Sequence, residues 1–161
     1  MSSHRLRRLP ALPAVAAAAA VLLAAAGCSA TDAQASITVP SPPPEEAAVC
    51  SALHEELPEK VSGLDRSDPE PDSELTAGWG DGAIVLRCGV ARPAGMSDPG
   101  ADAVEVDGVD WLLEQREGGG TRFTTTYRTA YVEVTLDERF TEMTPLLDLA
   151  APVRKTVPKS L

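Results

Sequence analysis

Cys28, Cys50, Cys88 and His54 are the side chains of this 161-residue chain that could act as nucleophiles or soft metal ligands. Cys50 and His54 are four residues apart, so on a helix they are neighbours and could form a nucleophile–base pair. Adding Cys88 gives three zinc ligands, but a fourth ligand is missing and the spacing lacks a zinc-finger pattern. Both chemistries need reduced thiols, so a disulfide between Cys50 and Cys88 would exclude both.

Cys28 ends a segment with the layout of a bacterial lipoprotein signal. A basic start (HRLRR) is followed by residues 11–26, which are uniformly apolar or Pro, and then by Gly27 and Cys28. This order is typical of a secretory signal ending in a lipobox, whose cysteine is lipidated and becomes the new N-terminus. We predict a lipoprotein signal peptide over residues 1–27, lipidation of Cys28, and a lipid-anchored position on the extracytoplasmic face of the cell membrane.

Two alternatives to lipidation stay open at this stage. A retained transmembrane helix would have to be built from 16 apolar residues, which is short against the ~20 needed to span a bilayer. A plain signal peptide, cleaved without lipidation, is the other alternative, because Ala25 stands where lipoboxes usually have Leu.

Assigning Cys28 to a lipid leaves Cys50 and Cys88 as a pair in an oxidising compartment, where a disulfide is the default. Helical spacing over residues 45–57 places Cys50 on an apolar stripe, and alternation over residues 83–90 places Cys88 on an apolar strand face. Both sulfurs are therefore expected to point into the core. The predicted Cys50–Cys88 disulfide removes these thiols from catalysis and metal binding.

The remaining polar residues match no catalytic or metal-binding motif. An envelope hydrolase or transferase would have to use His54 with an acidic partner. The alternating carboxylates of residues 68–74 resemble a calcium loop, but Ser73 and Trp79 stand where an EF-hand needs Gly and Glu. We predict no catalytic residue, no metal and no cofactor.

Charge and length limit the partners and the domain organisation. Three of the 14 basic residues and none of the 24 acidic residues precede Cys28, so signal cleavage changes the formal net charge from −10 to −13. Such a surface repels nucleic acid and anionic headgroups, which leaves the lipid as the means of membrane attachment. We predict a lipidated, Pro-rich tether over residues 28–44 and one globular extracytoplasmic domain over residues 45–161.

Periodicity within that domain predicts an α+β fold, a single small domain whose antiparallel sheet of about four to five strands has an N-terminal and a C-terminal helix and one disulfide. The C-terminal helix opens at Thr144 and ends or kinks at Pro152. The predicted elements are a helix over 45–57, strands over 83–90, 103–106, 109–113, 122–127 and 130–136, and the helix from 144.

The best local signal is Asp107-Gly108, which lies between two alternating apolar runs and predicts a type I′ hairpin turn. That turn pairs Val106 with Val109 and Val104 with Trp111. The face expected to be buried is Val104, Val106, Val109, Trp111 and Leu113.

Four residues near tight turns and on strands are candidates for a small recognition surface: Trp79, Asp81, Arg87 and Trp111. The alternative is that both tryptophans belong to the core and that Arg87 pairs across the sheet with Glu133 or Asp110.

The segments WGDGAIVLRCGV (79–90), VDGVDW (106–111), FTTT (123–126) and YVEV (131–134) resemble the actinobacterial domain of unknown function 3515 family, over roughly residues 49–150. The resemblance implies a secreted or membrane-attached protein and supplies no activity or site residue. We therefore expect a non-catalytic module of the cell envelope that binds an unknown envelope component or protein. A purely structural envelope protein is a further alternative.

Overall fold

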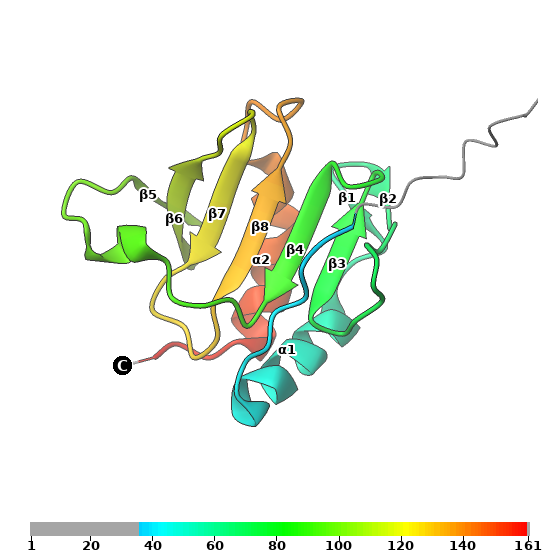
Figure 1. The fold of residues 1–161 in the computed structure, drawn as a ribbon, viewed down its shortest axis with the longest axis horizontal. Coiled ribbons are helices and arrows are strands. Elements are labelled where there is room, and N and C mark those ends of the chain that lie inside the picture. Colours follow the sequence, from blue (N-terminus) through cyan, green and yellow to red (C-terminus); the bar gives the residue numbers. More distant parts are fainter. Residues whose placement is uncertain (1–35, 161) are drawn as a thin grey trace, which may run out of the picture. The chain divides into compact units, whose positions relative to one another are not determined.

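Alternating apolar residues build a six-stranded antiparallel sheet in the computed structural model, which describes residues 36–160 (Figure 1). The predicted signal peptide and Cys28 lie outside the described residues. Every described element belongs to one compact unit, residues 31–161. The strand order is β3-β4-β8-β7-β6-β5, and a separate two-stranded ribbon joins β1 (Lys60–Val61) to β2 (Leu64–Asp65). The six strands are β3 (Thr76–Trp79), β4 (Ile84–Cys88), β5 (Ala103–Val106), β6 (Val109–Gln115), β7 (Thr121–Thr125) and β8 (Val132–Leu136).

The α+β class and the antiparallel sheet confirm the prediction, whereas the strand count is larger than expected. The strand that was missed in the main sheet is β3, whose sequence TAGW is buried at all four positions. A strand buried on both sides does not alternate, so its period of two is absent from the sequence. β1 and β2 are two residues each, too short for any periodicity to identify.

The β5–β6 hairpin has the predicted register. Val106 pairs with Val109 and Val104 pairs with Trp111. Asp107 and Gly108 adopt φ angles of 46° and 76°, which is the left-handed pair that a type I′ turn requires.

One α-helix precedes the strands in the sequence and one α-helix follows them. α1 (Pro44–Glu56) begins with Pro at its first turn and carries Glu45 and Glu46 there, where acidic side chains interact favourably with the helix dipole. α2 (Thr144–Thr156) continues through Pro152, beyond which it stays helical for another turn. Leu149 before the proline and Val153 after it are both fully buried, so packing offsets the ~3 kcal/mol that an interior proline costs.

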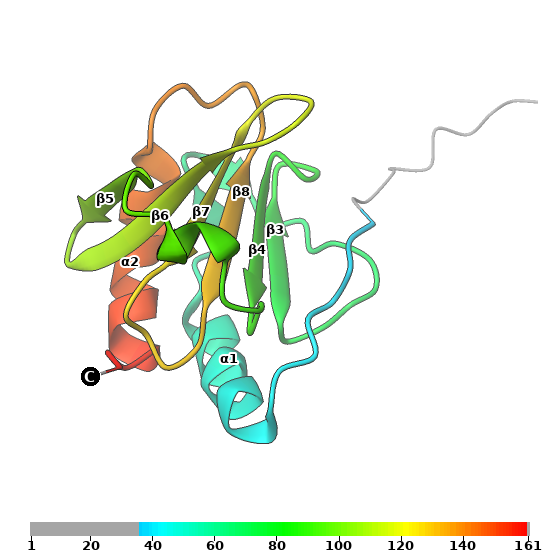
Figure 2. The ribbon, with the colours of Figure 1, turned by 60° about the vertical axis from the view of Figure 1, so that its left-hand side comes forward.

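Both helices cover the same face of the sheet, and the core lies between the two layers (Figures 1 and 2). On β4 and β8 the residues that point to the helices alternate with residues that point to the other face. The helices therefore leave one sheet face to be covered by other parts of the chain. Fully buried core side chains from the sheet and helices include Leu53, Trp79, Ile84, Leu86, Trp111, Val132, Val134, Leu136, Leu146 and Leu149.

The Cys50–Cys88 disulfide confirms the prediction and joins the two layers. Cys50 comes from α1 and Cys88 from the end of β4, their Cα atoms are 5.5 Å apart, and both residues are buried. The bridge fixes the N-terminal helix to the end of β4, the strand beside the edge strand β3.

Arg128 is a buried cation with a structural role. Its guanidinium donates hydrogen bonds to the carbonyl oxygens of Val157 (2.8 Å) and Gly108 (3.0 Å), so it ties the chain after α2 to the β5–β6 turn. Burial lowers the pKa of Arg128 from its ordinary value; Asp110 opposes this shift and Arg154 adds to it.

The outer edge of β3 is covered by the loop that follows β2. Ser67 donates its backbone N–H to the carbonyl oxygen of Gly78 (2.9 Å), and Arg66 forms an isolated antiparallel β-bridge with Trp79. Gly78 allows this approach, because a Cβ there would lie 2.6 Å from the carbonyl oxygen of Ser67. At the other end of the sheet, β5 is an edge strand of four residues with Glu105 exposed. No helix of residues 36–160, the short 3-10 helix η1 (Ala94–Ser97) included, has the length and apolar character needed to cross a bilayer.

Candidate functional site

Two adjoining hollows share Thr38 and Arg87. One extends past the end of β4 to the first turn of α1, and the other lies on the sheet face opposite the helices. The first, which we call the proline hollow, has a volume of about 480 Å³ and is bordered by Pro40, Pro42, Glu46, Val90, Arg92 and Tyr131. The second, the arginine hollow, has a volume of about 350 Å³ and is bordered by Ile37, Val85, Arg116, Arg122, Glu133 and Thr135. Volumes of this size fall within the range of small-molecule sites.

The wall between these hollows and solvent is the chain before α1, residues 36–43, which runs in front of β4 (Figure 1). Ile37 donates its backbone N–H to the carbonyl oxygen of Glu70 (3.0 Å), and Arg87 donates from Nη1 to the carbonyl oxygen of Thr38 (3.2 Å). These residues were predicted to be part of a tether. In the structure this part of the predicted tether is docked on the domain and forms part of the candidate site.

Gly89 permits this docking, and replacing it with Ala should release the segment. Gly89 has φ +81°, and a Cβ there would lie 2.5 Å from Pro42 Cγ. We expect Gly89→Ala to lower the free energy of unfolding by about 1–3 kcal/mol and to speed hydrogen exchange of the Ile37 amide.

Gly118→Ala is the matched control, because Gly118 has φ +88° but no atom within 4 Å of the added Cβ. It should show the backbone strain without faster exchange at Ile37. Unchanged exchange at Ile37 in Gly89→Ala would contradict the docking.

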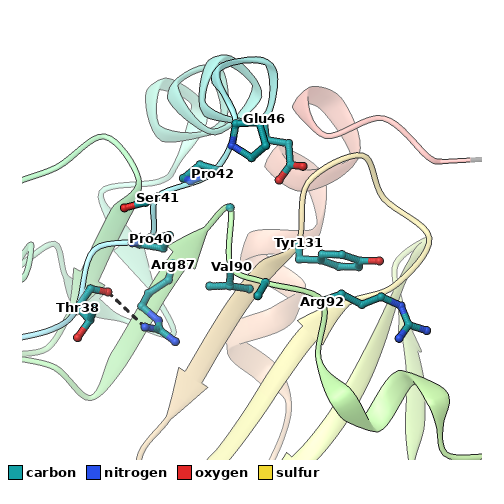
Figure 3. A pocket seen from close by; sticks show the side chains of 12 residues that line it. Thr38, Pro40, Ser41, Pro42, Glu46, Arg87, Val90, Arg92 and Tyr131 are labelled. Atoms are coloured by element: carbon teal, nitrogen blue, oxygen red, sulfur yellow. Dashed lines mark hydrogen bonds between the residues drawn. The ribbon is translucent and has the colours of Figure 1, made fainter.

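In the proline hollow, Arg87 and the prolines line one side and Arg92 and Tyr131 line the other, with Val90 between them (Figure 3). Arg92 is held by hydrogen bonds from Nη1 to Ser97 Oγ (2.9 Å) and from Nη2 to the carbonyl oxygen of Met96 (3.3 Å). The hollow thus combines rigid proline rings, an aromatic ring and guanidinium groups. This is a surface for binding, with apolar contact on one side and cationic hydrogen-bond donors on two sides.

Glu133 on β8 organises the arginine hollow. It lies opposite Arg87 in the β4–β8 register and accepts a hydrogen bond at Oε1 from Arg87 Nε (2.9 Å). The same oxygen forms an ion pair with Arg87 Nη2 at 2.8 Å. Its Oε2 lies 3.4 Å from Arg122 Nε, an ion-pair distance whose geometry does not make a hydrogen bond. The Glu133 side chain is 9% exposed, and those of Arg87 and Arg122 are 27% and 40% exposed. A buried carboxylate therefore holds two guanidinium groups that still reach solvent.

The lining of the arginine hollow is positively charged, whereas the chain as a whole is negatively charged. Residues 36–160 contain 11 Lys and Arg against 23 Asp and Glu. The arginine hollow is bordered by three arginines and one glutamate, whereas a hollow at the β5 edge is bordered by Glu105, Asp107 and Glu142 with no basic residue. The arginine hollow is thus a local excess of positive charge in a domain whose net charge is negative.

The structure separates the four residues predicted to form a recognition surface. Trp79 and Trp111 are fully buried on the helix-covered face: Trp79 lies opposite the core residue Ile84 of β4, and Trp111 is two residues from the core residue Val109 on β6. Asp81 is exposed in the β3–β4 turn, where its backbone N–H is hydrogen-bonded to Ser67 Oγ (2.8 Å). Of the four, Arg87 alone borders the hollows, and it has the predicted cross-sheet pairing with Glu133.

His54 contacts a basic side chain. Its Nε2 lies 3.4 Å from Arg66 Nη2, and the Arg66 guanidinium is 5.2 Å from the centre of the Trp79 ring. This cluster joins the loop after β2 to α1, and none of its three residues borders either hollow. In residues 36–160 no group of three or more His, Cys, Asp and Glu side chains is placed to hold a metal ion.

Arg116 and Arg122 border the arginine hollow but were not predicted from the sequence as site residues. Arg122 alternates with the core residue Phe123 on β7, so its outward direction is readable from the sequence, but its position beside Glu133 depends on the β7–β8 register. Arg116 follows β6 and reaches the same hollow from the β6–β7 loop. Only the order of the strands brings these residues to Arg87.

Comparison with curated proteins and with solved structures found no match. The model of one family, described as "Protein of unknown function (DUF3515)", matches residues 11–161. That range includes the disulfide, both hollows and every strand described above. The chain therefore belongs to the DUF3515 family.

Proposed function

We propose that this protein is a lipid-anchored extracytoplasmic module of the cell envelope that binds an envelope component or protein partner without catalysing a reaction. The observation that carries the proposal is the pair of adjoining hollows, of which the arginine hollow gathers positive charge in an otherwise acidic domain.

The location rests on the sequence of the first 28 residues and on the Cys50–Cys88 bridge. A disulfide persists in oxidising compartments and is rare in the cytosol. Lipid attachment would also explain how so acidic a domain stays at a membrane whose headgroups repel it.

Site-specific photocrosslinking in cells tests the binding face. A photoreactive amino acid is placed at Thr135, which borders the arginine hollow, in the full-length chain. The matched control position is Leu147 on α2, which is 56% exposed on the opposite layer. We expect one discrete crosslinked product from Thr135 and none from Leu147. Equal labelling of the two positions, or none at Thr135, would contradict a binding role for this face.

Metabolic labelling tests the anchor. Wild-type protein should incorporate a clickable palmitate analogue, and Cys28→Ala should lose the label completely, because the acyl chains depend on this thiol. Cys50→Ala serves as the control and should keep the label. Equal incorporation by wild type and Cys28→Ala would rule out lipidation at Cys28.

A further inference from the structure

The arginine hollow has the donors, charge and geometry of a site for an anionic group. Its cationic side chains come from three separate parts of the chain: Arg87 from β4, Arg116 from the β6–β7 loop and Arg122 from β7. With Glu133 as the one acidic residue on its border, the formal charge of the lining is positive by two. We propose that this hollow is an oxyanion subsite, which takes a phosphate or carboxylate group of the ligand.

The proposal rests on the proposed function, because it names the chemical group that the binding face would recognise. Guanidinium groups are suited to this task, since their planar N–H donors match the oxygens of phosphate and carboxylate. An anion carrying two charges would neutralise the lining.

Several donors in the hollow have no acceptor. Arg122 Nε is buried and makes no hydrogen bond among the described residues, and Arg122 Nη1 is 4.0 Å from the nearest carboxylate oxygen of Glu114. The Arg116 side chain is exposed and has no hydrogen-bond or ion-pair partner within residues 36–160. The buried Arg122 Nε–H is costly to leave without an acceptor, and an anion beside it would supply one. The exposed Arg116 guanidinium is free to donate to the same anion.

Glu133 is a positioning residue in this site. Each of its two oxygens faces one guanidinium, with 2.8 Å to Arg87 Nη2 and 3.4 Å to Arg122 Nε. Arg87 is fixed further by its hydrogen bond to the carbonyl oxygen of Thr38. The two arginines are therefore held before a ligand arrives, which lowers the entropy cost of binding it.

The hollow also has an apolar part. Ile37 and Val85 line it beside the arginines, so the portion of the ligand next to its anionic group would contact aliphatic side chains. Arg87 and Thr38 are shared with the proline hollow, which continues the site toward Tyr131. With the anionic group in the arginine hollow, the remainder of the ligand would lie in the proline hollow, against its proline rings and Tyr131.

Titration of residues 29–161 tests the subsite, since this chain retains every described element and the disulfide. The probes are pyrophosphate and citrate, with chloride at equal ionic strength as the reference, and binding is followed by amide and Arg Nε–H chemical shifts. We expect saturable shifts at Thr38, Arg87 and Thr135 with at least one probe. Arg116→Gln and Arg122→Gln should each weaken binding by about tenfold or more, as expected for loss of a charge-assisted hydrogen bond.

Arg139→Gln is the matched control, because Arg139 is an equally charged arginine that pairs with Asp137 and lies outside both hollows. It should bind the probes like wild type. Equal weakening in Arg139→Gln would show a general charge effect and overturn the subsite. Arg116→Gln keeps the test independent of folding, since the Arg116 side chain is exposed.

Glu133→Gln separates positioning from simple electrostatics. The variant makes the hollow more positive, so electrostatics alone predicts tighter anion binding, whereas loss of positioning predicts weaker binding. We expect weaker binding, together with movement of the Arg87 Nε–H resonance in the unliganded protein. Tighter binding would overturn the role of Glu133.

Different results would contradict the oxyanion subsite and the proposed function. Absence of saturable shifts with both probes would overturn the oxyanion subsite. A discrete crosslink from Thr135 would in that case still support binding by this face to a ligand of other chemistry. Loss of the Thr135 crosslink would contradict the function, whatever the probes do.

Discussion

Replacing both Cys50 and Cys88 with Ala should lower the free energy of unfolding by about 4 kcal/mol. The bridge closes a loop whose ends are 38 residues apart in the sequence, and without it the unfolded chain regains the corresponding conformational entropy. For a domain of this size such a loss lowers Tm by roughly 12–20 °C. Urea denaturation of residues 29–161, followed by tryptophan fluorescence, measures the effect.

Reduction supplies the control for this prediction. Wild type treated with a phosphine reductant should unfold at nearly the urea concentration of the double variant, and the double variant should not respond to the reductant. A double variant whose free energy of unfolding lies within about 1 kcal/mol of wild type would contradict this prediction. It would mean that the unfolded chain is already restricted without the bridge.

Each tryptophan should be a large contributor to stability and not a binding residue. Trp79 and Trp111 are both fully buried, and we expect Trp79→Ala and Trp111→Ala each to cost about 3–5 kcal/mol through the cavity that remains. Neither should show an affinity change when binding is measured under conditions where the variant is still folded.

Substitution by Phe distinguishes the two tryptophans more finely. Trp79 donates from Nε1 to the carbonyl oxygen of Pro58 (3.0 Å), whereas Trp111 Nε1 has no acceptor within the described residues. We expect Trp79→Phe to cost about 1 kcal/mol more than Trp111→Phe, because only the first loses a hydrogen bond and leaves a carbonyl unsatisfied. Equal costs in chemical denaturation would contradict this assignment of the indole hydrogen bonds.

The local features of the fold were predictable because they depend on short-range patterns. The Asp107-Gly108 turn set the register of the β5–β6 hairpin, and two separate periodicities turned Cys50 and Cys88 inward. Alternation also placed Trp111 on the buried face of its hairpin, which supports its core role over the predicted recognition surface. What could not be predicted was the strand order, since pairing of β4 with β8 joins segments that lie far apart in the sequence.

The candidate site depended on that unpredicted order. Glu133 and Asp110 were the two cross-sheet partners predicted for Arg87, and the β4–β8 register selects Glu133. Arg122 joins them only through the pairing of β7 with β8. Residues 36–43 form one wall by docking on the sheet, and a Pro-rich segment without periodicity gives no sign of where it docks.

The covered edge of β3 restricts how a partner can be recognised. Many modules bind peptides by adding a strand to an open sheet edge, where backbone hydrogen bonds supply affinity. Here the carbonyl oxygen of Gly78 is already occupied by the Ser67 N–H, and the opposite edge is the four-residue β5 with exposed Glu105. Short, charged or covered edges oppose strand addition. Recognition is therefore left to side chains on the open sheet face, so specificity would depend on the chemical groups of the ligand and not on a peptide backbone.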